Sequence, residues 1–154
     1  MYKKVYLIIV SYLLVFPAIV HSAEQSLSVE NAWIRLVPPV AVNTAGYFKI
    51  TNTSDKKVTI VSAESDVAKK TEIHDMKMEN GGMSMVHVPR LTLAPGETIG
   101  LKPGGKHLML IGLHKPLKKD QVVSVTFKFE DGTSQVISFP VLKSMKQEKM
   151  KHHH

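Results

Sequence analysis

The feature that most constrains the fold is a series of short segments in which apolar and polar side chains alternate. In the segment QVVSVTFKF apolar residues occupy every second position, and Asp131-Gly132, a pair that suits a type I′ turn, follows it. Alternation with period two indicates a half-buried strand. About eight or nine such segments follow Ala23, and none has the pattern of an amphipathic helix. The sequence therefore predicts an all-β, single-domain, antiparallel sandwich with Greek-key connections.

Residues 1–22 have the organisation of a secretory signal peptide. Lys3 and Lys4 precede an apolar run from Val5 to Val20. As a helix this run spans about 24 Å, which is less than the roughly 30 Å hydrocarbon core of a bilayer. The small residues before Ala23 suit cleavage. We therefore expect export to the periplasm, with membrane contact only during export; an uncleaved anchor is the alternative.

Composition excludes several classes of function. The chain has no cysteine, which excludes disulfides, thiolate metal sites and lipid attachment through a cysteine. The net charge is +7, but the expected domain, residues 23–142, carries only +2 of it. A domain that binds nucleic acid is expected to carry a basic patch, so no nucleic-acid partner is predicted. The sequence also has no Gly-x-Ser-x-Gly or His-Glu-x-x-His motif, and no enzymatic function is predicted.

The segment EIHDMKMENGGMSMVHV, residues 72–88, concentrates methionine and histidine. Asn80-Gly81 within it is a strong signal for a two-residue hairpin loop. With that loop, strand parity places six side chains on one face: His74, Met76, Met78, Met83, Met85 and His87. The opposite face is polar, so we expect the sulfur-bearing face to point inward or to line a groove. Packing of these methionines in the core is the alternative.

A second pair of the same chemistry lies further along the chain. His107 and Met109 are two positions apart on an expected strand and share a face. Thioethers are soft, neutral donors that suit Cu(I) better than hard cations or zinc, and imidazole suits copper as well. Such a site holds Cu(I) and releases it to an acceptor that carries thiolates. These residues therefore predict a copper carrier.

The spacing of these residues resembles the motif of the PCuAC family of periplasmic copper chaperones. That motif is a His, ten residues, a Met, twenty-one residues and then His-x-Met, and His74, Met85, His107 and Met109 reproduce it. The segments AWIRLVPP, AGYFKITN, LAPGETIGLKPGGKHLMLIGLHKPL and VTFKFEDG are similar to the family as well. The resemblance covers roughly residues 29–142.

The resemblance implies a cupredoxin-like β-sandwich in which Cu(I) is bound by His74, Met85, His107 and Met109. It also implies copper transfer, directly or alongside Sco-type proteins, to the copper centre of cytochrome c oxidase. The remaining side chains of the hairpin face then surround the ligands, form an access route or serve as packing: Met76, Met78, Met83 and His87. Periplasmic copper storage or resistance is an alternative function, and a structural Ig-like module without metal is a further one. We expect a monomer.

Residues 143–154 have little apolar surface to bury and are expected to form a flexible tail. A second copper site, suited to Cu(II), is one interpretation of its methionines and histidines, and a solvated terminus is the other. The residues concerned are Met145, Met150, His152, His153 and His154.

Overall fold

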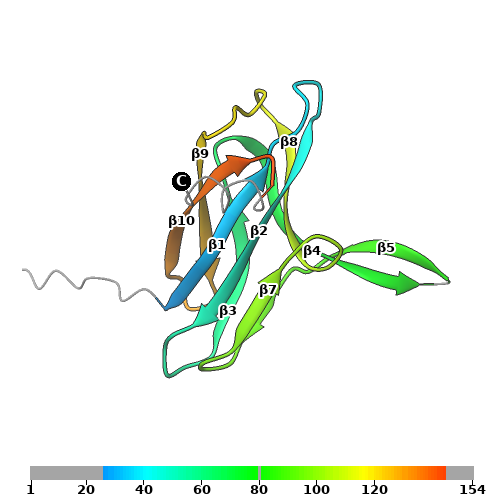
Figure 1. Ribbon diagram of the computed structural model, residues 1–154. Coiled ribbons are helices and arrows are strands. Elements are labelled where there is room, and N and C mark those ends of the chain that lie inside the picture. Colours follow the sequence, from blue (N-terminus) through cyan, green and yellow to red (C-terminus); the bar gives the residue numbers. More distant parts are fainter. Residues whose placement is uncertain (1–25, 80, 145–154) are drawn as a thin grey trace, which may run out of the picture.

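The computed structural model describes residues 26–79 and 81–144, and every regular element in these ranges is a strand (Figure 1). The strands are β1 (Leu27–Arg35), β2 (Asn43–Asn52), β3 (Val58–Glu64), β4 (Ala68–Glu79), β5 (Gly82–His87), β6 (Leu91–Leu93), β7 (Thr98–Leu101), β8 (His107–Leu113), β9 (Val122–Phe129) and β10 (Ser134–Leu142). The all-β prediction is confirmed. Within the same ranges, no helix is long and apolar enough to cross a membrane.

Seven of these strands close into a barrel. Their order is β4-β8-β2-β1-β10-β9-β3, and β3 returns to β4 through the pair Ala63–Thr71. Strands β1 and β10 pair in parallel at Ile34–Val141, whereas the other pairs are antiparallel. An open sheet leaves unpaired N–H and C=O groups on its edge strands. Closure of the barrel pairs these groups, and it brings β1 and β10 together although they run in the same direction. The sheet is thus closed and mixed, where an antiparallel sandwich was predicted; the cupredoxin-like Greek-key assignment stays a prediction.

The interior of the barrel is apolar and draws side chains from all seven strands. Its buried members include Ile34, Phe48, Ile50, Ile60, Ile73, Leu108, Leu110, Val125, Phe127, Phe139 and Val141. The ring of Phe48 packs 5.3 Å from that of Phe139 and 5.7 Å from that of Phe127, measured between centroids. Full burial of one such side chain stabilises the fold by about 1.5–3 kcal/mol. The barrel therefore forms a rigid platform for the strands at its surface.

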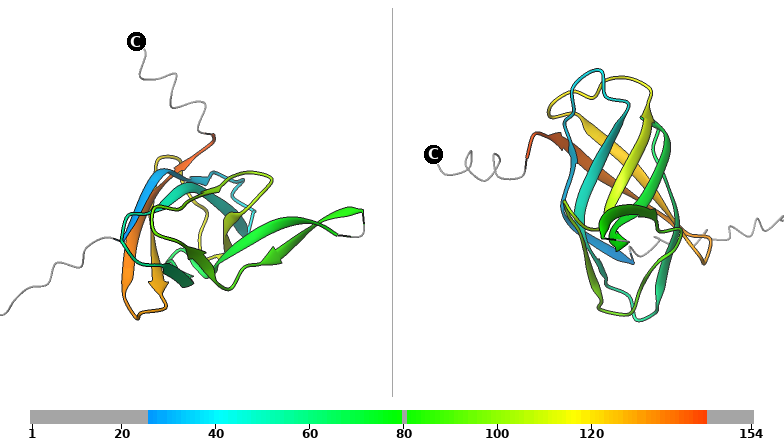
Figure 2. Two further views of the ribbon diagram at one scale, coloured as in Figure 1. Left: turned by 90° about the horizontal axis from the view of Figure 1, so that it is seen from below. Right: turned by 90° about the vertical axis from the view of Figure 1, so that its right-hand side faces the viewer.

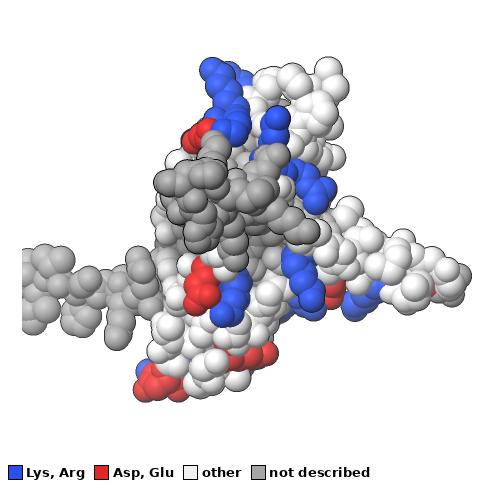
Figure 3. All heavy atoms as spheres, viewed as in Figure 1, with Lys and Arg blue, Asp and Glu red and all other residues white. Residues whose placement is uncertain are grey.

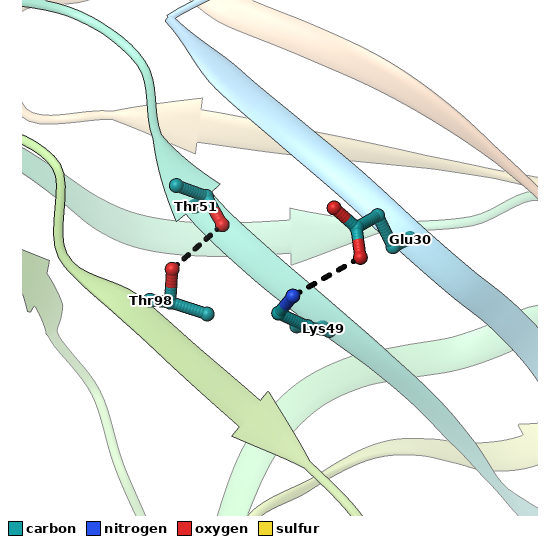
Figure 4. A network of polar contacts seen from close by, with 4 residues as sticks. All are labelled: Glu30, Lys49, Thr51 and Thr98. Atoms are coloured by element: carbon teal, nitrogen blue, oxygen red, sulfur yellow. Dashed lines mark hydrogen bonds and ion pairs between the residues drawn. The ribbon is translucent and has the colours of Figure 1, made fainter.

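The outer face of β1, β2 and β7 is polar around Lys49, whereas Trp33, Tyr47 and Leu142 form a separate apolar cluster on β1, β2 and β10. Lys49 Nζ donates a hydrogen bond of 3.1 Å to Glu30, and the hydroxyl groups of Thr51 and Thr98 lie 2.8 Å apart (Figure 4). Ile50, between Lys49 and Thr51, is buried in the barrel. The period-two alternation on which the strand prediction rested is confirmed here.

Strand β4 is part of both the barrel and the β4–β5 hairpin. Its first part, from Ala68 to His74, pairs with β8 in the barrel, and its second part, from His74 to Glu79, pairs with β5. The β4–β5 hairpin leaves the barrel and projects from its side, as Figure 1 and the left view of Figure 2 show. The register predicted from Asn80-Gly81 is confirmed, from His74–His87 to Glu79–Gly82.

Two of the sequence-based expectations concern residues outside the described ranges. They are the signal peptide, residues 1–22, and the copper ligands of the tail: Met145, Met150, His152, His153 and His154. Both stay predictions.

Candidate metal centre

Three histidines form a row across neighbouring strands. His74 of β4 pairs with His87 of β5 on one side and with His107 of β8 on the other. The ring centroid of His74 lies 5.5 Å from that of His87 and 6.2 Å from that of His107. Residues directly opposite each other in antiparallel strands share a face, so all three rings stand on the same side of the sheet. The row lies where the hairpin leaves the barrel.

The two methionines of the predicted site lie on either side of this row. Met85 pairs with Met76, one side-chain position from His74 toward the tip of the hairpin. Met109 pairs with Glu72, one position from His74 toward the barrel. Parity places both methionines on the face that carries the histidines. The structure therefore brings His74 and His107 into direct proximity and places Met85 and Met109 diagonally to His74 in opposite directions.

This face points away from the barrel core, so of the two expectations, inward or groove-lining, the inward one is wrong. The interior side of β4 and β8 is formed by the alternate residues, such as Ile73 and Leu108. Met78 is 70% exposed, Met83 55% and Met85 49%. Packing of Met78 and Met83 in the core is thereby excluded. The physical reason is that the hairpin extends beyond the barrel, where no layer formed by residues 26–79 and 81–144 covers its sulfur-bearing face.

His107 is held by the turn that precedes β8. Its Nδ1 donates a hydrogen bond of 2.8 Å to the carbonyl of Gly105, and the residue is only 7% exposed. Its neighbour Leu108 pairs with Gly46 of β2, where an added Cβ would lie 3.4 Å from the Leu108 side chain. A glycine at this position lets β2 and β8 pack closely. The Nε2 atom of His107 keeps its lone pair for a metal ion, because Nδ1 carries the proton.

Glu72 is a part of the site that sequence reasoning missed. Its Oε2 accepts a hydrogen bond of 2.9 Å from Nε2 of His74. This bond, assisted by the nearby His87, holds the pKa of the Glu72 carboxyl below its usual value. Glu72 lies two positions before His74, so the same parity that grouped the histidines and methionines would have identified it.

The bond to Glu72 also determines which nitrogen of His74 is available. Because Nε2 donates to the carboxylate, the lone pair of the neutral ring lies on Nδ1. That Nδ1 atom is buried and has no hydrogen-bond partner. A carboxylate on the far nitrogen of a metal-binding histidine fixes the ring and raises its basicity. Each of His74 and His107 thus offers one free nitrogen with the other anchored.

The donors on this face are imidazoles and thioethers, which are borderline and soft metal ligands. Among the described residues, no group of three or more His, Asp or Glu side chains is arranged to hold a metal ion by itself. The thioethers of Met85 and Met109 stand on the same face as the two imidazoles. Neutral nitrogen and thioether donors without a thiolate fit Cu(I) best.

On the opposite face an ion pair ties β4 to the start of β8. Lys106 Nζ donates a hydrogen bond of 2.7 Å to Asp75, whose side chain is only 16% exposed. This bond lowers the pKa of Asp75. Asp75 directly follows His74, and Lys106 directly precedes His107. The ion pair on this polar face therefore joins the two strands next to their histidines. The pair therefore holds the two histidine-bearing strands in register from behind.

A groove of about 350 Å³ reaches the histidine row from the side opposite His107. It is lined by residues of β3, β4 and the segment after β5, among them Glu72 and His87, and most of its surface is apolar. In the view of Figure 3, basic and acidic side chains are interspersed over the barrel, and most of the projecting hairpin surface is neither.

Solved structures define the class of fold. The copper-bound PCuAC domain from PmoF2 matches with a TM-score of 0.64 over 77% of this chain and 94% of that chain, at 18% identity, which shows the fold. The structure of CuI-DR1885 from Deinococcus radiodurans matches with a TM-score of 0.60 at 34% identity, over 80% of this chain and 85% of that chain. The barrel with its projecting hairpin is thus a PCuAC-type domain, as the spacing of histidines and methionines indicated.

Sequence comparison then gives the family. A family model described as "Putative lipoprotein LpqE-like" matches residues 27–141. "Putative lipoprotein Lxx21020" of Leifsonia xyli subsp. xyli is 32% identical over 116 residues, 75% of this chain and 69% of that protein. "Uncharacterized protein RP573" of Rickettsia prowazekii is 30% identical over 125 residues, 77% of this chain and 68% of that protein. The chain belongs to the LpqE-like family.

Proposed function

We propose that this protein is a copper chaperone that binds Cu(I) through His74, Met85, His107 and Met109. The observation that carries the proposal is the direct pairing of His74 with His107 across β4 and β8, with a methionine diagonal to His74 on each side. Two distant segments of the chain, which share the same soft donor chemistry, meet at one surface. The Cu(I) form of DR1885, a structural relative at 34% identity, supports copper as the metal.

The anchoring of both imidazoles supports the same proposal. Glu72 holds Nε2 of His74, and the Gly105 carbonyl holds Nδ1 of His107. Rings held in this way need little reorganisation to bind a metal ion, which favours affinity. The thioethers are the adaptable part of the site, since Met85 is 49% exposed and Met side chains have three rotatable bonds. A site with two fixed and two adaptable ligands suits reversible transfer.

Export to the periplasm and delivery of Cu(I) complete the proposal. The acceptor is a copper-binding subunit of cytochrome c oxidase or a Sco-type protein, whose thiolates compete for Cu(I) more strongly than thioethers. In this proposal residues 1–22 are a signal peptide, residues 23–142 a monomeric copper-binding domain of the cupredoxin-like type, and residues 143–154 a tail. The family model and one relative are described as putative lipoproteins, but this sequence contains no cysteine to which a lipid could be attached.

Anaerobic titration with Cu(I) against a competing chelator tests the proposal. The wild type is expected to bind more than about 100-fold tighter than the His74→Ala/Met109→Ala variant, because loss of a ligand exceeds the 10–100-fold effect typical of an outer partner. His114→Ala removes an exposed imidazole that belongs to none of the proposed copper sites and is the matched control. Equal affinity of the wild type and the His74/Met109 variant would show that this site does not bind Cu(I).

Copper storage or resistance is a second function that the same site would serve. A deletion strain grown at limiting copper separates the two. Loss of oxidase activity under these conditions supports delivery, whereas normal oxidase activity with sensitivity to excess copper supports defence.

A further inference from the structure

The outer half of the β4–β5 hairpin carries three thioethers that the proposed copper site does not use. Met78 and Met83 are direct cross-strand partners, and Met76 is diagonal to Met83. Direct partners have Cβ atoms about 4.5–5.5 Å apart and diagonal neighbours about 7–8 Å apart, distances that long side chains bridge. Each methionine has three rotatable bonds. The three sulfur atoms are therefore able to converge on one point.

Exposure distinguishes these side chains from core methionines. Met78 is 70% exposed and Met83 55%, and the hairpin that carries them stands away from the barrel (Figure 2). Alternate positions of the same strands carry Lys77, Glu79 and Ser84, which lie on the opposite face. A row of exposed apolar side chains on one face is a feature of binding surfaces. Packing against the described part of the chain does not account for the exposure of Met78 and Met83.

The chemistry of this row narrows the ligand to one class. Three neutral thioethers without an imidazole or a carboxylate favour a soft monovalent cation and provide little affinity for Zn²⁺ or Cu²⁺. We infer that Met76, Met78 and Met83 form a second, thioether-only site for Cu(I), separate from the His74 site and closer to the hairpin tip. The inference rests on the proposed function in one respect, which is that Cu(I) is the metal ion this protein meets.

Silver(I), which mimics Cu(I) and does not undergo redox reactions in air, is the probe. The full chain is labelled with 13C at the methionine methyl groups, and each methyl resonance is assigned by single Met→Leu substitution. We expect the methyl groups of Met76, Met78 and Met83 to shift and saturate within two equivalents of Ag(I), in addition to those of Met85 and Met109. In Met78→Leu/Met83→Leu the shift of Met76 is lost, while those of Met85 and Met109 persist.

Two matched measurements make the test specific. Met145→Leu/Met150→Leu removes two thioethers from the tail and should leave the response of the outer three methyl groups unchanged. Zn²⁺ should leave those three resonances in place. Leucine has a volume similar to that of methionine, and Met78 and Met83 are exposed, so their substitution keeps the fold.

The outcomes separate this inference from the proposed function. If Met85 and Met109 respond and the outer three methyl groups stay in place through two equivalents, the second site is absent and the proposed function stands. If Met76 still shifts in Met78→Leu/Met83→Leu, the three thioethers do not act together and the inference is wrong. If the outer three respond while Met85 and Met109 do not, the second site stands and the proposed function fails.

Discussion

The two halves of strand β4 have the same alternation of side chains but differ in burial, because one half lies in the barrel and the other in the hairpin. In the barrel half, Thr71 and Ile73 are buried against the core, and the alternate side chains face outward. In the hairpin half, Met78, Met83 and Met85 are largely exposed. The comparison shows that the barrel supplies stability together with two of the donors, His107 and Met109, whereas the hairpin supplies Met85. His74 stands at the boundary and takes part in both.

The largest expected effect sharpens this comparison through stability. Leu108→Ala removes a fully buried side chain and is expected to lower the free energy of unfolding by about 2–5 kcal/mol, because a cavity remains in the packed core. Met78→Ala, at an exposed position on the hairpin, should change it by less than about 0.5 kcal/mol. Urea unfolding of the metal-free protein measures both. A loss for Met78→Ala as large as that for Leu108→Ala would mean that the hairpin is part of the core.

The next effect concerns the link between the two regions. Glu72→Ala removes the carboxylate that anchors His74 and is expected to weaken Cu(I) binding about 10–100-fold. Glu79→Ala, on the opposite face of the same strand, is the matched control and should leave the affinity unchanged. Competition with a Cu(I) chelator measures both. Tighter binding by Glu72→Ala would show instead that Glu72 blocks the site.

The dependence of Cu(I) affinity on pH tests whether the imidazoles of His74 and His107 are ligands. An imidazole must be neutral to bind a metal ion, and an ordinary imidazole has a pKa near 6.5. Because the pKa of Glu72 is lowered, its carboxylate stays ionised between pH 5 and 8 and adds no titration of its own. Cu(I) affinity should therefore fall below about pH 6, by about tenfold per pH unit for each imidazole that binds. A flat profile between pH 5 and 8 contradicts the assignment of His74 and His107.

The smallest expected effect comes from the ion pair behind the histidines. Since the bond from Lys106 lowers the pKa of Asp75 from 3.8, the pair stabilises the fold above about pH 4, and this stabilisation is lost as the pH falls through the lowered pKa. Asp75→Asn should cost less than about 1 kcal/mol at pH 7, because the Lys106 side chain is partly exposed. Urea unfolding at pH 7 and pH 3 measures the difference, which should be smaller at the lower pH. If wild type and Asp75→Asn differ equally in free energy of unfolding at both pH values, the substitution acts through packing and not through the ion pair.

Local features of the site could be predicted from the sequence because they depend on strand parity and turn chemistry. Asn80-Gly81 predicts the register of the β4–β5 hairpin, and the structure confirms each pair. The second turn was predicted less well. Only Gly132 of Asp131-Gly132 has a positive φ, of 84°, and Phe129 N donates to Thr133 O, so the loop is longer than the two-residue type I′ turn expected.

Non-local features could not be predicted in the same way. His74 meets His107 because β4 pairs with β8, and which strands become neighbours depends on closure of the whole barrel. The inward alternative for the sulfur-bearing face was wrong for a related reason. A row of alternating methionines has the same pattern on a core strand as on a projecting one, and only the extension of β4 beyond the barrel decides between them.

X-ray absorption at the copper edge, on the protein loaded with less than one equivalent of Cu(I), tests the central claim most directly. The account predicts imidazole nitrogen and thioether sulfur together in the first coordination sphere, with the sulfur signal reduced in Met85→Leu/Met109→Leu and the nitrogen signal reduced in His74→Ala. A copper ion surrounded by nitrogen and oxygen alone, unchanged by the methionine substitutions, would contradict it.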